Sequence, residues 1–314
     1  MTRRCAAEGM SIEEPRARSR SSSLHRTLDR ALAAAVGDRI LPAVDRYVAG
    51  PPTSHGLRRR IRRLEIPGAT PVAPRDRRER RFRVPLTKVT TPLGFSFDPG
   101  GWHPYVATLA MLEDGQLLDP IKTPLFEYYR RFTPRTVQEA LLEDVEAPLD
   151  PLGSWPIRGG LLSVWALTRR SVERALREAQ PRTRQFIGPQ DDARVGEDVH
   201  RLWRVLDSIR AGGYRPDEHP GRPISGYFLV SDDDFRFVCR HGNHRLAALT
   251  TLGYAEVDVR IAEGIPPLVG SRDLAWWTTE RGGLLPEDVA HRLFSKLFNE
   301  TGRQKAQNVG LLPA

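Results

Sequence analysis

The chain has 314 residues, 39% of them hydrophobic, which is enough to bury one sizeable core or two small ones. No apolar run approaches the roughly eighteen residues that a membrane-spanning helix needs, and the start of the chain lacks the apolar segment of a secretory signal. We therefore expect a cytoplasmic protein without a transmembrane segment. The two cysteines, Cys5 and Cys239, are too few for a disulfide framework or a zinc site, so no metal site is expected from them.

The formal net charge of +9 is concentrated in the N-terminal third of the chain. Residues 1–90 hold 21 Lys and Arg against 9 Asp and Glu, whereas the remainder is slightly acidic. The densest pieces, residues 57–63 and 75–83, could neutralise the phosphates of RNA, of DNA or of an anionic membrane surface. However, the chain has only 4 lysines beside 44 arginines, which favours a coding bias over selection for nucleic-acid contacts. Nucleic-acid binding stays an open alternative that we do not favour.

We predict that residues 1–84 form a basic, partly disordered N-terminal extension. Residues 1–23 are rich in Arg, Ser and Glu and poor in apolar side chains, which is typical of disorder. Apolar residues then recur near helical spacing, which predicts an amphipathic helix at residues 24–48. Prolines among arginines in residues 49–84 indicate an extended linker.

From residue 85 onward the composition becomes aromatic and apolar. We expect residues 85–184 to form a mainly helical accessory region. Thr136 is placed to cap a helix that runs through Leu142, and residues 165–177 have the spacing of another amphipathic helix. Residues 188–190, Gly-Pro-Gln, are a candidate lid, with a plain structural turn as the alternative.

The most informative stretch is residues 226–250, because it predicts two strands joined by an acidic turn, then a glycine, then a helix. A chain that leaves a strand at Gly242 and enters a helix within about two residues directs several N–H groups without helical partners at one point. The helix dipole adds partial positive charge there, so such a corner can bind an anion. Side-chain donors at the same corner come from Arg240, His241, His244 and Arg245. The alternative, a turn glycine beside solvated arginines, stays open.

The surrounding sequence adds features in a definite order. First comes a helix that ends at Ser208-Ile209, followed by a glycine pair and Pro216. After these come the hairpin, the Gly242-Asn243-His244-Arg245 corner, and a Leu252-Gly253 turn that leads into a last strand. Because these features occur in this order, residues from about 200 to 262 resemble the ParB/sulfiredoxin-like domain. The resemblance implies an α+β fold with a small mixed sheet over residues 185–264. Residues 265–314 then form a C-terminal extension, whose prolines and glycines do not fit the helix-turn-helix domain that follows in ParB partition proteins.

In that family the corner binds nucleotide phosphates. ParB proteins carry Gly-Glu-Arg-Arg there and bind CTP, and sulfiredoxins carry Gly-Cys-His-Arg and use ATP. Gly242 and Arg245 match both patterns, and His244 matches the sulfiredoxin pattern. Asn243 matches neither. It stands where sulfiredoxins have the catalytic cysteine, so sulfiredoxin activity is not supported, and where ParB has its glutamate, so ParB-style CTP hydrolysis is not implied.

The resemblance implies binding of a nucleoside triphosphate, ATP or CTP, together with Mg²⁺. The residues expected to hold its phosphates are Arg240, His241, Gly242, Asn243, His244 and Arg245. No pattern identifies a catalytic residue, but His103, Asp191 and Asp192 are candidates that the accessory region could bring to the pocket. For His103, a packed or solvated loop histidine is the alternative. The Asp232–Asp234 tip is a poor catalytic candidate, because it lies roughly 20 Å along the strand from the corner.

Three functions therefore remain open. The first is a nucleotide-dependent enzyme, such as a kinase or NTPase acting on a small molecule or a protein. The second is a nucleotide-binding switch without turnover, which Asn243 favours because it is neither acidic nor a thiol. The third is a nucleic-acid-associated protein that acts through the basic N-terminal region. Nucleotide binding is common to the first two, and we expect it.

Overall fold

The computed structural model describes residues 66, 69–72, 81–113, 119–143, 165, 185–216, 223–262, 267–278 and 285–313. The helix expected at residues 24–48, the basic residues 57–63 and almost all of the helix expected at residues 165–177 lie outside the described residues.

The described residues form seven strands and seven α-helices, which is an α+β composition. The strands are β1 (Thr70–Val72), β2 (Arg81–Pro85), β3 (Val89–Thr90), β4 (Ser225–Ser231), β5 (Asp234–His241), β6 (Glu256–Ile261) and β7 (Leu268–Gly270). The helices are α3 (Pro104–Glu113), α4 (Pro124–Arg131), α5 (Val137–Leu141), α7 (Asp192–Gly212), α8 (Asn243–Thr251), α9 (Glu287–Asn299) and α10 (Arg303–Asn308). In these residues no helix has both the length and the apolar content needed to cross a bilayer.

All seven strands belong to one mixed sheet, in the order β1-β2-β6-β4-β5-β3, with β7 also paired to β4. The predicted β4–β5 hairpin is present and antiparallel. One edge of β4 is shared by two parallel neighbours, because β6 pairs with Ser225 and Gly226 whereas β7 pairs with Phe228 to Val230. On the far side of the hairpin, β3 runs parallel to β5.

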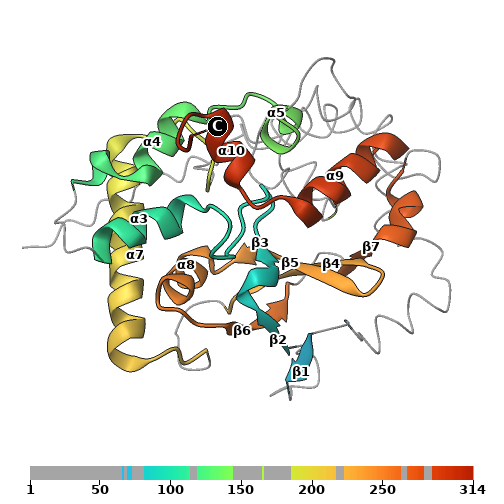
Figure 1. The fold of residues 1–314 in the computed structure, drawn as a ribbon, viewed down its shortest axis with the longest axis horizontal. Coiled ribbons are helices and arrows are strands. Elements are labelled where there is room, and N and C mark those ends of the chain that lie inside the picture. The colour runs from blue at the N-terminus through green and yellow to red at the C-terminus, as the bar shows by residue number, and fades with distance from the viewer. Residues whose placement is uncertain are drawn as a thin grey trace, which may run out of the picture. The chain divides into compact units, whose positions relative to one another are not determined.

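Helices α3, α7 and α8 pack against one another beside this sheet (Figure 1). On α7, the predicted helix before the glycine pair, the buried apolar residues recur at spacings of three and four, so one stripe of the helix faces the core. They are Val195, Val199, Leu202, Leu206 and Ile209. Within the sheet, the ring of Phe228 lies edge-on to Phe82 of β2 and Phe237 of β5, with centroid distances of 5.2 and 5.1 Å.

The structure differs from the predicted linker at residues 49–84, because β1 and β2 lie within it. Strand β2 pairs along its whole length with β6, and Phe82 and Val84 are buried. The predicted boundary after residue 84 therefore falls inside a strand. Two arginines of the basic stretch are ion-paired with Asp258 of β6: Arg81 at 3.4 Å and Arg83 at 2.9 Å. These two side chains belong to the sheet rather than to a separate basic arm.

The described part of the accessory region contains the helices α3, α4 and α5. Thr136 caps α5, since its side-chain oxygen accepts a hydrogen bond from the Glu139 N–H, as the sequence predicts. The C-terminal extension supplies β7 to the sheet, followed by α9 and α10. At the hairpin tip, Asp234 forms an ion pair with Lys88 at 2.6 Å and Asp232 with Arg272 at 2.7 Å, so two acidic residues of this tip have structural partners.

Candidate functional site

The candidate site is the corner between β5 and α8. Strand β5 ends at His241, Gly242 has the left-handed conformation with φ of +108°, and α8 begins at Asn243. A Cβ atom on Gly242 would lie 2.7 Å from Cγ1 of the buried Ile224, so both the backbone conformation and the close approach require glycine. The predicted succession of strand, glycine and helix is present.

The start of α8 has backbone donors that the helix itself does not use. The first helical hydrogen bond joins the Leu246 N–H to the Gly242 carbonyl at 3.0 Å, so the N–H groups earlier in the first turn have no helical partner. Gly242 has no side chain with which to cap them. Together with the helix dipole, these donors favour a negatively charged group at this end of α8.

The six residues predicted at the corner differ in exposure. His241 is exposed, Asn243 is buried, and Arg240, Gly242, His244 and Arg245 are half-buried. Arg240 lies in a β-bulge, because Ser225 pairs with His241 and Gly226 with Cys239, which leaves Arg240 without a counterpart on β4. Bulges are frequent beside active sites, where they redirect a side chain.

The two corner arginines have different buried neighbours. Burial raises the pKa of Tyr214 to about 12 and that of Cys239 to about 12, and the charge of Arg245 opposes both increases. Burial also raises the pKa of Tyr227, and there the opposing charge is that of Arg240. Arg245 therefore lies near Tyr214 and Cys239, whereas Arg240 lies near Tyr227. Cys239 is a packed, protonated thiol.

A chain of hydrogen bonds connects the start of α8 to the accessory region and α7. Asn243 Nδ2 donates to Gln185 Oε1 at 2.9 Å, and Gln185 Nε2 donates to the Tyr105 hydroxyl at 3.1 Å. The Tyr105 hydroxyl in turn donates to Asp198 Oδ2 at 3.4 Å. His244 completes the cluster, with Nε2 3.6 Å from Asp198 Oδ1 and its ring centroid 4.6 Å from that of Tyr105.

His103, one of the candidate catalytic residues, lies beside this cluster. It is buried immediately before α3, and its Nδ1 accepts a hydrogen bond from the Tyr105 N–H at 3.1 Å. Burial holds its pKa well below the usual value, and the neighbouring His244 lowers it further. The ring is therefore neutral, with its proton on Nε2. That atom is buried without a hydrogen-bond partner among the described residues, as is Asn243 Oδ1.

The other two candidates have structural positions. Asp191 caps α7, since its Oδ1 accepts a hydrogen bond from the Arg194 N–H at 2.7 Å, and Asp192 lies in the first turn of that helix. Both are exposed, and no hydrogen bond or ion pair among the described residues joins either to the corner. The acidic residue that does reach the cluster is Asp198, on the buried face of the same helix.

The candidate lid at residues 188–190 is packed rather than free. The Gly188 N–H donates to the Phe132 carbonyl at 2.9 Å, and a Cβ on Gly188 would lie 1.8 Å from the Tyr129 carbonyl oxygen. Only glycine allows this contact with α4. The segment therefore differs from a closing loop and serves to hold Phe186 and Ile187 in the core.

The sequence missed Tyr105, Gln185 and Asp198 as members of the site. Asp198 carried a usable signal, because an acidic residue between Val195 and Val199 interrupts the apolar stripe of α7. No sequence pattern marks Tyr105 or Gln185, since only the fold brings them beside α8. No family model, curated protein or solved structure matches this chain, so the site is defined by its own geometry.

Proposed function

We propose that the corner between β5 and α8 binds the phosphates of a nucleoside triphosphate, ATP or CTP. The observation that carries the proposal is the left-handed Gly242, which begins α8 without a capping side chain. Backbone donors of the first turn then meet the charge of Arg245 at one end of the helix. The resemblance to the ParB/sulfiredoxin-like domain, in which this corner has that role, supports the same assignment.

A second observation also favours a polar ligand here. Asn243 Oδ1, His103 Nε2 and His244 Nε2 are buried without a hydrogen-bond partner among the described residues. An unsatisfied buried polar atom costs about 1–3 kcal/mol, so three of them in one cluster favour a bound molecule that completes their hydrogen bonds. Asn243 presents an acceptor and His103 a donor, which suits the hydroxyl groups of a ribose or of a second substrate.

The cluster also favours turnover over a passive switch. Burial lowers the pKa of His244, against the opposing effect of Asp198, so its imidazole is neutral near pH 7. A neutral imidazole beside a buried carboxylate can accept a proton from a hydroxyl nucleophile and share the resulting charge with its partner. We assign His244 this role, with Asp198 as its positioning residue.

The residues at the corner do not form a magnesium site of their own. The oxygens of Asp198 face Tyr105, Arg194 and His244, two of which are cationic or become so on protonation, and this environment does not suit a divalent cation. Magnesium would arrive with the triphosphate, bound to its oxygens. No step of the proposal depends on it.

Calorimetry of the full chain with ATP, CTP and GTP, each with magnesium, tests the proposal. We expect one of them to bind the wild type, and Arg245→Gln to weaken it at least tenfold, because a charge-assisted hydrogen bond to phosphate contributes about 1.5–3 kcal/mol. A second variant replaces the five arginines of residues 57–63 with glutamine and should bind equally well. The opposite pattern would assign binding to the basic arm and contradict the proposal.

A further inference from the structure

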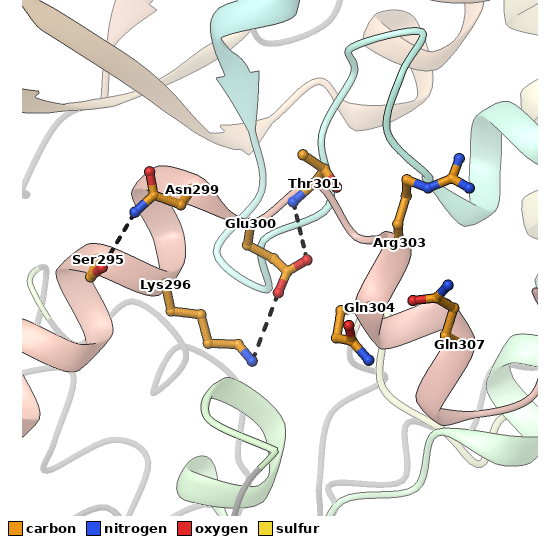
Figure 2. Close-up of a pocket in the computed structure, with 8 residues that line it drawn as sticks. All are labelled: Ser295, Lys296, Asn299, Glu300, Thr301, Arg303, Gln304 and Gln307. Atoms are coloured by element: carbon orange, nitrogen blue, oxygen red, sulfur yellow. Dashed lines mark hydrogen bonds and ion pairs between the residues drawn. The ribbon is translucent and has the colours of Figure 1, made fainter. Parts of the chain in front are cut away.

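A separate pocket lies between α9 and α10, and none of the corner residues lines it. Its volume is about 440 Å³, within the range of small-molecule sites. It is lined by Ser295, Lys296, Asn299, Glu300, Thr301, Arg303, Gln304 and Gln307 (Figure 2). Every one of these residues is polar or charged. Because pockets for apolar molecules are lined mainly by apolar and aromatic side chains, this lining favours a hydrophilic ligand.

The charged side chains that line the pocket have a net positive charge. Glu300 is already compensated, because its Oε1 accepts hydrogen bonds from the N–H groups of Thr301 and Gly302 at 3.0 and 2.9 Å, and its Oε2 lies 3.8 Å from Lys296 Nζ. Arg303 extends along the opposite side of the pocket from Lys296 (Figure 2). It is exposed, and no ion pair joins its guanidinium group to a carboxylate in the part of the chain that the structure describes. The group best placed to receive an anion is therefore Arg303.

The amide side chains present both acceptors and donors to the pocket. Gln304 Nε2 donates to Asn308 Oδ1 and Gln307 Nε2 donates to the Pro313 carbonyl, both at 2.9 Å. Asn299 Nδ2 donates to Ser295 Oγ at 3.3 Å. Each NH₂ group uses one of its two hydrogens in these bonds, so each amide has its carbonyl oxygen and one N–H left for a ligand. Ligand groups that donate hydrogen bonds, such as hydroxyls, are complementary to the oxygens.

One wall of the pocket is held by a buried ion-pair cluster. Lys296 Nζ lies 3.1 Å from Glu143 Oε1 and donates to the Leu142 carbonyl at 3.3 Å, at the end of α5. Glu143 also pairs with Lys305, whose side chain is fully buried. Buried ion pairs contribute little net stability, so their presence here is better explained by the fixed orientation that they give to Lys296 and Glu300. The pocket wall is therefore preorganised.

We propose that this pocket binds a small hydroxylated anion, a polyol that carries one carboxylate or phosphate group. The anionic group contacts Arg303, and the hydroxyls donate to the amide oxygens of Gln304 and Gln307. A carboxylate and a phosphate share this chemistry, because both accept charge-assisted hydrogen bonds from a guanidinium group. The proposal is independent of nucleotide binding at the corner.

Binding of three probes to the full chain, measured by calorimetry, tests this inference. Gluconate carries the carboxylate, sorbitol 6-phosphate carries the phosphate, and sorbitol is the uncharged control. We expect at least one of the anionic probes to bind, and sorbitol to bind at least tenfold more weakly. The anion with the higher affinity identifies the source of the charge. Absence of binding by both anions at millimolar concentration, or equal affinity for sorbitol, would overturn the proposal.

Variants locate the site. Arg303→Gln is expected to weaken binding of the preferred anion about tenfold, because it removes the charge but keeps the length and polarity of the side chain. Arg204→Gln, at an exposed position on α7, is the matched control and should leave the affinity unchanged. Arg245→Gln should also leave it unchanged, which separates this pocket from the corner. Equal binding by wild type and Arg303→Gln would place the anion elsewhere.

Discussion

At the scale of single residues, Gly242 is the position on which the candidate site depends. Its φ of +108° is unfavourable for residues with a Cβ atom, and Ile224 fills the space that such an atom would occupy. Gly242 separates the last residue of β5 from the first residue of α8. Because it has no side chain, it leaves the first-turn N–H groups of α8 without a side-chain cap. The sequence pattern predicted this position, but not the contact with Ile224, which comes from the chain before β4.

Replacement of Gly242 by alanine should lower the free energy of unfolding by about 1–3 kcal/mol, from backbone strain and the clash with Ile224. Gly196→Ala is the matched control, because a Cβ at this helical position on α7 meets nothing within 4 Å. That substitution should stabilise the chain by about 0.5–1 kcal/mol. Urea denaturation measures both, and an unchanged stability of Gly242→Ala would contradict the conformation described for the corner.

A second residue-scale prediction concerns Cys239. Burial raises the pKa of this thiol to about 12, so it should carry almost no thiolate at pH 8 and should be closed to reagents. In a Cys5→Ser variant, iodoacetamide is expected to leave the folded chain unmodified. It should label the chain once the fold is lost in about 8 M urea. Mass spectrometry measures the labelling. Modification of the native chain at the rate of a free thiol would show that Cys239 is accessible.

At the scale of elements, the sequence predicted those with a strong local pattern. The helix that ends before the glycine pair, the acidic turn of the hairpin and the Thr136 cap of α5 all have short-range signals, and all three are present. It missed β1 and β2, because prolines and arginines dominate their surroundings and hide the inward alternation of Phe82 and Val84. Strands β3 and β7 have only two and three residues, so their pairing depends on the finished fold.

Strand β2 gives a direct test of that correction. Phe82→Ala should lower the free energy of unfolding by about 3–5 kcal/mol, the usual cost of removing a buried phenyl ring. Ile121→Ala is the control, because that side chain is 44% exposed and its loss should be nearly neutral. Denaturant unfolding distinguishes the two outcomes. A negligible effect of Phe82→Ala would restore the view of residues 49–84 as a linker.

The ion-pair cluster that joins α5, α9 and α10 predicts a pH dependence. Burial raises the pKa of Glu143, but Lys305 and Lys296 outweigh it and lower the pKa from its ordinary value, and Glu300 Oε2 lies 3.8 Å from Lys296 Nζ. A carboxylate with a lowered pKa in the folded state stabilises the fold above its unfolded pKa, and this contribution is lost as the pH falls through the folded value. Stability should therefore fall in acid, from about pH 4.5 downward.

Glu143→Gln should reduce stability at pH 7 by about 3 kcal/mol, because it leaves the buried Lys305 without its partner. The difference from wild type should shrink as the pH is lowered below 4.5, the ordinary pKa of the group. A second substitution, Lys305→Met, should restore most of the stability of Glu143→Gln, since no buried charge then remains. Urea unfolding at pH 7 and in acid measures all three chains. A constant difference at every pH would mean that Glu143 does not carry the charge assigned to it.

At the scale of the whole molecule, residues from distant parts of the chain form the candidate site. His103 lies just before α3 and Tyr105 lies in its first turn, Gln185 precedes α7, Asp198 lies on α7, and Asn243 begins α8. Sequence patterns describe neighbours within about a helical turn or a strand pair, so they could identify the glycine corner but not the network behind it. That network depends on the packing of α3, α7 and α8.

Binding of phosphate groups at the first turn of α8 should change the backbone amide chemical shifts of that turn. Inorganic triphosphate, which carries the phosphate chain common to all nucleoside triphosphates, is titrated into the ¹⁵N-labelled full chain. We expect the largest shift changes at Asn243, His244 and Arg245. Unchanged resonances at these three residues, with changes confined to the arginines of residues 57–63 or found nowhere, would contradict phosphate binding at this turn.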